Sequence, residues 1–332
     1  AGLPRERLWQ VRAKRVIIAT GAIERHMVFA NNDRPGIMLA SAARTYLNHF
    51  GVAVGSKVGV YTACDSAWNA ALDLKQAGVS VPAIVDVRPD PDPKLVARAK
   101  ELGIEVLAGQ AVLDTSGSLR VKSVKVGRAS GGSTRDIAID ALIMSAGWTP
   151  SVHMYSQSRG KVVWDEDSQR FLPGRNVQDC ESVGACNGVD DLNQAVAGAA
   201  KAGHDAAVAA GVKSGAAWVA PSAETKTSWA GNMMGSAAGA GADTTVKAFV
   251  DFQNDVTAKD IRLAVREGMH SIEHVKRFTT NGMATDQGKT SNIHGLAIAA
   301  EMLDKPLPQV GLTTFRSPYT PVTFGAIVNH SR

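Results

Sequence analysis

Residues 57–88, KVGVYTACDSAWNAALDLKQAGVSVPAIVDVR, decide the fold class. An apolar strand through Tyr61 is followed by a helical pattern from about Asp65 to Gln76 and by a second apolar strand that ends at Asp86. Continuously apolar strands are typical of a parallel sheet that is covered on both faces. The stretch therefore predicts a strand–helix–strand unit of the Rossmann-like kind.

The turn after the first strand lacks the glycines that a bound phosphate needs. In the motif G-x-G-x-x-G they permit a tight turn, a close approach of the backbone to the phosphates, and packing of the helix on the strand. The corresponding residues are Thr62, Cys64 and Ala67, and only alanine is an accepted substitute. Asp65 adds negative charge at the helix start. We expect this turn not to bind a dinucleotide and Asp86 to be a relic or a surface acid.

The surrounding patterns extend the sheet. Residues 8–22 alternate and then become apolar, which predicts a strand that ends in a Thr-Gly pair. Residues 119–140 predict a hairpin with a glycine-rich turn, and residues 141–150 a buried strand stopped by a Thr-Pro pair. Strands that alternate with helices predict an α/β fold with a mostly parallel sheet and a small antiparallel insertion.

The chain of 332 residues predicts at least two domains. Residues 1–212 are assigned to Rossmann-like sheet domains, with a second dinucleotide fold at about 52–145 inserted. A segment rich in Gly, Ala, Ser and Thr at 213–245 is interpreted as a linker, and 246–332 as a small helical domain. In that domain, helix starts are predicted at Thr257 with Asp260, at Ser271 and at Ser291.

Composition limits the classes of function. The net charge is +5, and the basic run at 4–15 is interpreted as the solvated face of a strand pair, so no nucleic-acid partner is expected. The apolar runs are too short for a membrane span. Three cysteines without a C-x-x-C pair indicate neither disulfides nor a cysteine metal site, and a cytoplasmic location is expected. The start at AGLPRERLWQ, without Met, suggests a piece of a longer polypeptide.

Two further features are interpreted as structural. His270 and His274, with Glu273 between them, have a spacing that suits zinc on a helix face, but a helix boundary at Ser271 separates them, so no metal site is expected. Trp148 is interpreted as a packing anchor.

Several motifs together resemble a known family. RVIIATGAIER (15–25) and ESVGACNGVDDLNQAVAGAAKAG (181–203) resemble motifs of flavoproteins with two dinucleotide folds, of the pyridine nucleotide-disulfide oxidoreductase type. The segments at 24–48, 145–166 and 247–261 resemble, more narrowly, the α subunits of heterotetrameric sarcosine oxidases. The resemblance covers the whole chain except the linker.

The resemblance implies NAD in the first dinucleotide fold. Asn187 stands where these flavoproteins carry an acid, and the implied NAD contacts are Asn187, Leu192 and Gln194, with Thr20 and Gly21 adjacent. Alternatively, Leu192 and Gln194 only cap and pack their helix. The resemblance also implies FMN shared with a β subunit, FAD and tetrahydrofolate elsewhere in the complex, and a folate domain after this chain.

The small helical domain resembles a ferredoxin-like module that holds an iron–sulfur cluster. The four ligand positions are occupied by Asp251, Gln253, Asn281 and Asp286. Because such clusters are held by thiolates, none is expected here. Lys276, Arg277 and Lys289 flank the irregular segment 279–290 and are candidates for an FMN phosphate; alternatively, Lys276 and Arg277 are solvated helix residues.

The implied activity is that of a flavin oxidase acting on CH–NH donors with oxygen as acceptor. Sarcosine would be converted to glycine and hydrogen peroxide, with formaldehyde or 5,10-methylenetetrahydrofolate as the one-carbon product, in a complex with β, γ and δ subunits. No catalytic residue is assigned to this chain, which is not expected to be active alone. The alternatives are a subunit of a related proline or opine dehydrogenase and a scaffold subunit without cofactor.

Overall fold

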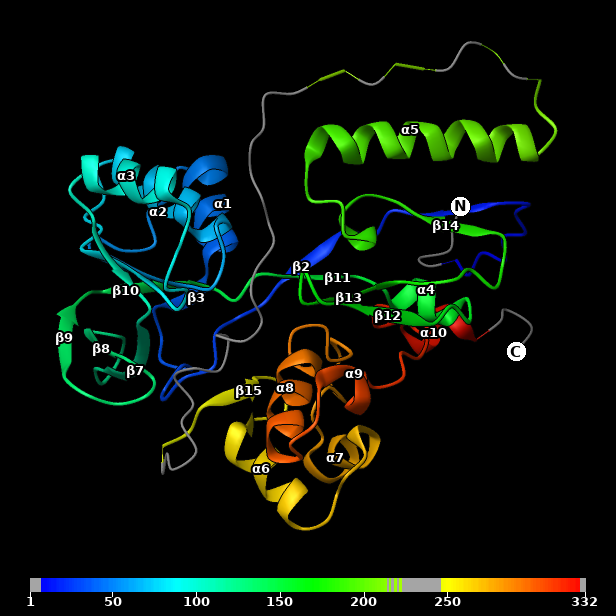
Figure 1. Ribbon diagram of the computed structural model, residues 1–332. Helices are drawn as coiled ribbons and strands as arrows, with labels where there is room; N and C mark the ends of the chain where they lie inside the picture. Colours follow the sequence, from blue (N-terminus) through cyan, green and yellow to red (C-terminus); the bar gives the residue numbers. More distant parts are fainter. Residues whose placement is uncertain (1–6, 214, 216–217, 220, 223–245, 329–332) are drawn as a thin grey trace.

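The computed structural model describes residues 7–213, 215, 218–219, 221–222 and 246–328 (Figure 1). These residues form a lobe around a five-stranded sheet, a group of short paired strands with a long helix, and a small helical domain. Most of the predicted linker at 213–245 lies outside the described residues, so the domain boundaries remain predictions.

A five-stranded sheet forms the centre of the first lobe. Its strands are β3 (Ile37–Leu39), β4 (Val58–Thr62), β5 (Ala83–Asp86), β6 (Glu105–Ala108) and β10 (Ala141–Ser145). The order is β3-β10-β4-β5-β6, and every neighbouring pair is parallel. All residues of β4, β5 and β10 are buried, which explains the continuously apolar sequence of these strands. The sheet also includes β3, which precedes the predicted start near residue 52.

Helices cover one face of this sheet and a second sheet covers the other. The helices are α1 (Ala40–Phe50), α2 (Ser66–Gln76) and α3 (Pro93–Glu101), and they share one apolar cluster with the strands. The second sheet contains β7 (Ala111–Ser116), β8 (Ser123–Gly127) and β9 (Thr134–Ala138). Its Val112 and Val126 belong to one cluster with Tyr61 of β4. The predicted strand–helix–strand unit and hairpin are confirmed, and β7 adds a third strand to the hairpin.

Short strands connect the lobe to the rest of the chain and correct two predictions. They are β1 (Val16–Ile18), paired parallel with β14 (Cys180–Ser182), and β2 (Ala22–Glu24), paired antiparallel with β11 (Trp148–Pro150). A single strand over 8–22 is wrong, because the described residues 7–15 have no strand partner and the chain turns at Gly21, where φ is +70°. The basic run therefore forms no strand pair in residues 7–15. Similarly, β10 ends at Ser145, and the chain turns at Gly147 (φ +95°) before β11.

A long helix lies beside the β1–β14 pair. This helix, α5 (Leu192–Ala209), follows a single 3-10 turn, η1 (Gly184–Asn187), after β14 (Figure 1). The remaining elements of this part are α4 (His153–Gln157) and the hairpin of β12 (Val162–Asp165) and β13 (Arg170–Pro173). Among the helices of the described ranges, none combines the length and the apolar composition that crossing a bilayer requires.

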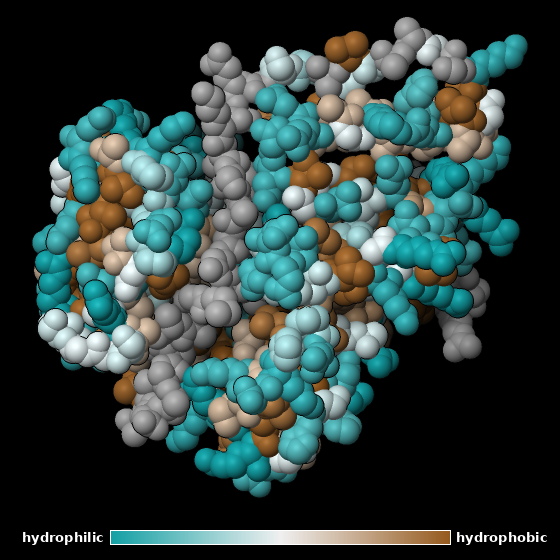
Figure 2. Space-filling view, in the orientation of Figure 1, coloured by the Kyte–Doolittle hydropathy of each residue, from teal (hydrophilic) through white to brown (hydrophobic). Residues whose placement is uncertain are grey.

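The small helical domain begins with a two-stranded pair. Its elements are β15 (Phe249–Asp251), β16 (Val256–Thr257), α6 (Ala258–Arg266), α7 (Ile272–Thr279), α8 (Asn292–Met302), α9 (Leu307–Val310) and α10 (Phe324–Ile327). The predicted capping box is confirmed, because Thr257 Oγ1 accepts from Asp260 N while the Asp260 carboxylate accepts from Thr257 N. Ser271 and Ser291 precede α7 and α8 as predicted. Hydrophilic residues dominate the outer face around α6 and α7 (Figure 2).

Candidate functional site

The turn between β4 and α2 is filled by its own side chains. Cys64 is fully buried, and its Sγ lies 3.1 Å from Ser66 Oγ and 3.2 Å from Ser145 Oγ. Thr62 Oγ1 donates to the backbone oxygen of Ser145 at 3.1 Å. In a dinucleotide-binding turn the backbone here must be open to phosphate oxygens. Thiol and hydroxyl groups occupy that place instead.

Arg88 joins the two acids of the same unit. Its Nη1 lies 2.7 Å from Asp65 Oδ1, and its Nη2 lies 2.7 Å from Asp86 Oδ2. Asp86 also accepts from Trp68 Nε1 at 2.9 Å and is fully buried, so a surface location for this acid is wrong. Because the carboxylate that would bind a ribose is satisfied inside the protein, the residues of this unit do not fit a dinucleotide.

At three of the four positions that correspond to cluster ligands, polar side chains hydrogen-bond within or between the loops at 251–254 and 279–290. Asp251 is buried, and its carboxylate accepts from the backbone amides of Gln253 (2.9 Å), Asn254 (3.1 Å) and Gly282 (2.7 Å). Gln253 Oε1 accepts from Thr285 Oγ1, and Asp286 accepts from Gly288 N and Thr290 Oγ1. Asn281 is buried. Iron in such clusters is bound by thiolates, and this donor set does not fit one.

The Asp251 contacts predict a local loss of stability on substitution. Asp251→Ala removes three hydrogen bonds to backbone amides and leaves these groups unpaired near the start of the irregular segment. We expect the free energy of unfolding of the small helical domain to fall by about 2–4 kcal/mol. Chemical denaturation followed by hydrogen exchange of α7 and α8 measures this. Glu301→Gln, at an exposed position of α8, is the control, and equal stability of the two variants would contradict the prediction.

A cationic pocket lies between α7 and the segment that follows α9. It has a volume of about 360 Å³. Its lining includes the basic residues Lys276, Arg277 and Arg316, together with His153, Phe315 and Tyr319. Glu273 is the one acid among the lining residues named for this pocket, and its Oε1 accepts from Thr314 N at 2.7 Å. Burial opposes ionisation of Glu273, but the bonds from Thr314 and the charges of Lys276 and Arg277 lower its pKa overall.

The third predicted cation lies beside this pocket rather than in its lining. Lys289 Nζ donates to the backbone oxygen of Tyr319 and is 3.8 Å from the centroid of the Tyr319 ring. Lys289 lines a smaller neighbouring cavity, which shares His153 and Phe315 with the cationic pocket. The structure therefore brings Lys276 and Arg277 together on one cavity, whereas Lys289 contacts Tyr319 and lines the neighbouring cavity.

His153 is a component of this site that sequence patterns did not reveal. It is buried, and neither ring nitrogen has a hydrogen-bond partner among the described residues. Its ring centroid is 4.1 Å from that of Phe315. Burial, together with the charge of Lys289, lowers its pKa to about 4, so the imidazole is neutral near pH 7. His153 lies far along the chain from Phe315 and Tyr319, and no local spacing could have indicated their contact.

The residues implied for NAD gather at one end of the β1–β14 pair. Thr20 and Gly21 follow β1, Asn187 ends η1 after β14, and α5 begins at Leu192. Thr20 Oγ1 donates to Ser151 O at 2.7 Å. Leu192, Asn187 and Gln194 are exposed. The N-cap of α5 is Asp191, whose side chain accepts from Gln194 N. Leu192 is 47% exposed.

The histidine pair near α7 lies across a helix start. His270 precedes the N-cap residue Ser271, while His274 lies within α7. Glu273 between them bonds to Thr314. Throughout the part of the chain that the structure describes, no three residues of His, Cys, Asp or Glu are grouped so as to hold a metal ion.

The comparisons with known proteins agree with the resemblance of the motifs. Residues 245–330 match the family described as the sarcosine oxidase A3 domain. The chain is 39% identical over 343 residues to the sarcosine oxidase subunit alpha of Corynebacterium sp. (strain P-1), which covers 100% of this chain and 35% of that protein. The chain is homologous to sarcosine oxidase subunit alpha. The subunit alpha of Rhizobium meliloti (strain 1021) is 39% identical over 327 residues, covering 98% of this chain and 32% of that protein.

This sarcosine oxidase homologue spans about a third of the length of the curated relatives it matches. Among solved structures, L-proline dehydrogenase from P. horikoshii is similar, with a TM-score of 0.63 and 20% identity over 96% of this chain and 59% of that chain. The likeness shows the fold alone. It confirms the predicted α/β class, with Rossmann-like sheet domains and a small helical domain.

Proposed function

We propose that the chain supports the oxidative demethylation of sarcosine by seating NAD and FMN in a sarcosine oxidase. Sarcosine, oxygen and water would give glycine, formaldehyde and hydrogen peroxide, or 5,10-methylenetetrahydrofolate where tetrahydrofolate captures the one-carbon unit. The support is the identity of 39% to two named sarcosine oxidase subunits along nearly the whole chain. The complex would be a cytoplasmic heterotetramer with β, γ and δ subunits.

The cationic pocket is the observation that carries the FMN part of the proposal. Lys276, Arg277 and Arg316 bring three positive charges to one cavity, while Glu273, the one acid named in its lining, bonds to Thr314 and lies 3.8 Å from Arg277 Nη2, so the lining keeps a net positive charge. Charge-assisted hydrogen bonds to phosphate are among the stronger polar contacts, and arginine suits phosphate oxygens. The residues present therefore fit a phosphate group. The FMN, when bound, supplies electron transfer to oxygen, while Lys276 and Arg277 hold its phosphate and neutral His153 adds no charge.

The β1–β14 end is the proposed NAD site. The backbone at Thr20 and Gly21 and the exposed side chains of Asn187, Leu192 and Gln194 surround the carboxyl ends of two parallel strands. Ligands of open α/β sheets bind at such ends. Asn187 replaces an acid, so an amide would contact the nucleotide without adding negative charge. The roles proposed for this chain are the binding and orientation of cofactors. FAD and tetrahydrofolate would bind elsewhere in the complex, where sarcosine would also be oxidised.

The substrate is tested on the intact complex. We expect peroxide formation with sarcosine and little with proline or opines. The likeness to L-proline dehydrogenase, at 20% identity, gives the fold and does not favour proline as substrate. Activity only with another amine would overturn the substrate assignment. Nucleotides extracted with acid from the same complex test the scaffold alternative, since an extract without NAD and FMN would support it.

The phosphate site is tested by charge reversal. We expect Lys276→Glu with Arg277→Glu to lower the affinity for FMN at least roughly tenfold, because two attractive charges become repulsive. FMN released by acid is compared with the FAD retained. The matched control is Lys259→Glu with Arg266→Glu, at two exposed positions of α6 outside the pocket. Unchanged FMN content in the pocket variant would contradict the phosphate assignment. The sarcosine assay would still test the proposed substrate independently.

A further inference from the structure

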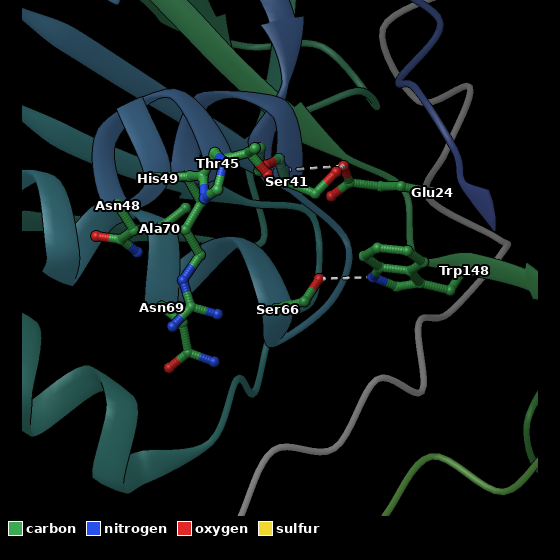
Figure 3. Close-up of a pocket in the computed structure, with 11 residues that line it drawn as sticks. Glu24, Ser41, Thr45, Asn48, His49, Ser66, Asn69, Ala70 and Trp148 are labelled. Atoms are coloured by element: carbon green, nitrogen blue, oxygen red, sulfur yellow. Dashed lines mark hydrogen bonds between the residues drawn. The ribbon is translucent and has the colours of Figure 1, made fainter. Parts of the chain in front are cut away.

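A second and larger cavity lies where α1 and α2 meet the β2–β11 pair (Figure 3). Its volume is about 520 Å³, within the range of small-molecule sites. It is lined by Glu24, Ala40, Ser41, Arg44, Thr45, Asn48, His49, Ser66, Asn69, Ala70 and Trp148. This cavity shares no lining residue with the cationic pocket.

Glu24 brings a buried carboxylate to this cavity. The residue is 3% exposed, and its Oε2 accepts from Ser41 N at 2.9 Å and from Ser41 Oγ. Its Oε1 has no hydrogen-bond partner in the described residues. Burial raises the pKa of Glu24, and the bonds from Ser41, with a smaller contribution from the nearby Ser145 hydroxyl, offset this only in part. A buried carboxylate oxygen without a hydrogen bond destabilises the folded protein. A ligand group that donates to Oε1 would supply this missing hydrogen bond, which favours binding.

An indole ring lies next to this carboxylate. Trp148 stands directly opposite Glu24 in the antiparallel register of β2 and β11, which places the two side chains on the same face of the pair. Its Nε1 donates to Ser66 Oγ at 3.0 Å, which fixes the orientation of the ring (Figure 3). A carboxylate beside an indole face attracts a cation through both its charge and the quadrupole of the ring.

The other ionisable side chains that line the cavity already have contacts within the protein. Arg44 Nε lies 2.6 Å from Asp73 Oδ2, and Asn48 Nδ2 donates to the same oxygen at 2.9 Å. The His49 ring makes an edge contact with Phe50, with centroids 4.6 Å apart. The unsatisfied charge-bearing atom is therefore Glu24 Oε1, and it selects a ligand that carries both positive charge and an N–H group.

We propose that this cavity binds a small primary or secondary ammonium ion. The ammonium group donates to Glu24 Oε1 and lies against the Trp148 ring, while the organic part extends toward Thr45 of α1 and Asn69 of α2. An anion would meet the Glu24 carboxylate, and a neutral alcohol would gain the hydrogen bond without the charge. The site is distinct from both proposed cofactor sites and does not depend on the proposed function.

Calorimetric titration of the intact protein, with any subunits it carries, tests the site. The probes are n-butylammonium, 1-butanol and butyrate at pH 8, which each contain four carbon atoms and differ in the head group. Butylammonium is expected to bind at least roughly tenfold more tightly than 1-butanol, and butyrate not at all. Equal affinity for butylammonium and butanol, or no binding of butylammonium at millimolar concentration, would overturn the proposal without any variant.

Substitutions then locate the binding. Glu24→Gln keeps the shape of the side chain and is expected to weaken butylammonium binding at least roughly tenfold, and Trp148→Leu to weaken it several-fold. Glu101→Gln, at an exposed position of α3, is the control. Thermal unfolding checks that each variant is folded. Butylammonium binding that is unchanged in both Glu24→Gln and Trp148→Leu would place the ion elsewhere and refute the site.

Discussion

Replacing Arg88 with methionine is expected to lower the free energy of unfolding by about 3–5 kcal/mol. Methionine keeps much of the volume but leaves the fully buried Asp86 without its cation, and it also breaks the 2.7 Å contact with Asp65. Burial alone would lower the pKa of Arg88, yet Asp86 and Asp65 raise it overall, which shows how strongly the three charges depend on one another. Urea denaturation of the purified protein measures the loss.

Two comparison variants separate charge from packing. Arg88→Met combined with Asp86→Asn removes the unpaired charge and is expected to recover part of the lost stability. Arg98→Met removes an exposed ion pair with Glu101 and is expected to change stability by about 0.5 kcal/mol or less. If Arg88→Met behaved like Arg98→Met, the Arg88 network would not be a stabilising element of the lobe.

Acid is expected to destabilise the contact between the small helical domain and the rest of the chain. His26, after β2, and His294, in α8, lie with ring centroids 4.4 Å apart, and both are buried. Burial lowers the pKa of His26 from 6.5 to about 4, and burial with the charges of His26 and Arg25 lowers that of His294 well below 6.5. Both imidazoles are therefore neutral in the folded protein near pH 7.

The sign follows from proton binding. Below pH 6.5 the unfolded chain binds protons on these histidines before the folded protein does, so stability falls as pH falls from 6.5 toward 4. For His26 alone the loss amounts to roughly 3 kcal/mol once the pH is below about 4. Urea midpoints measured across this range test it. His26→Phe with His294→Leu should flatten the profile, whereas His270→Gln, at an exposed residue, should not. An equally steep profile in the double variant would refute the assignment.

The regular lobe could be predicted from local sequence because each of its signals is local. The strands at 58–62 and 83–86 are buried on both faces and therefore apolar up to their last residues, Thr62 and Asp86, and the capping box at Thr257 places both partners three residues apart. The strand predicted over 8–22 failed for the opposite reason. Its pairing depends on residues 180–182, and a turn at Gly21 interrupts a pattern that periodicity alone continues.

The residues of the candidate sites also fall into two groups, those that local sequence can indicate and those that only tertiary packing brings together. Lys276 and Arg277 could be proposed from sequence because they are adjacent cations beside an irregular segment, and the structure adds that both line one cavity. His153, Arg316 and Tyr319 join them only through tertiary packing. Glu24 and Trp148 meet across one strand pair although they are far apart in the chain, and each alone looks like an ordinary helix-capping acid or packing aromatic residue.

The Asp251 carboxylate also has a consequence for durability. An oxidase of the proposed kind releases hydrogen peroxide, and thiolates exposed to peroxide are oxidised stepwise to sulfenic and sulfinic acids. The chain has three cysteines, all before residue 187, and the loop around Asp251 is joined by carboxylate-to-amide bonds that have no redox state. If the proposed activity holds, the fold around Asp251 would not depend on an iron supply and would resist the peroxide that such a complex releases.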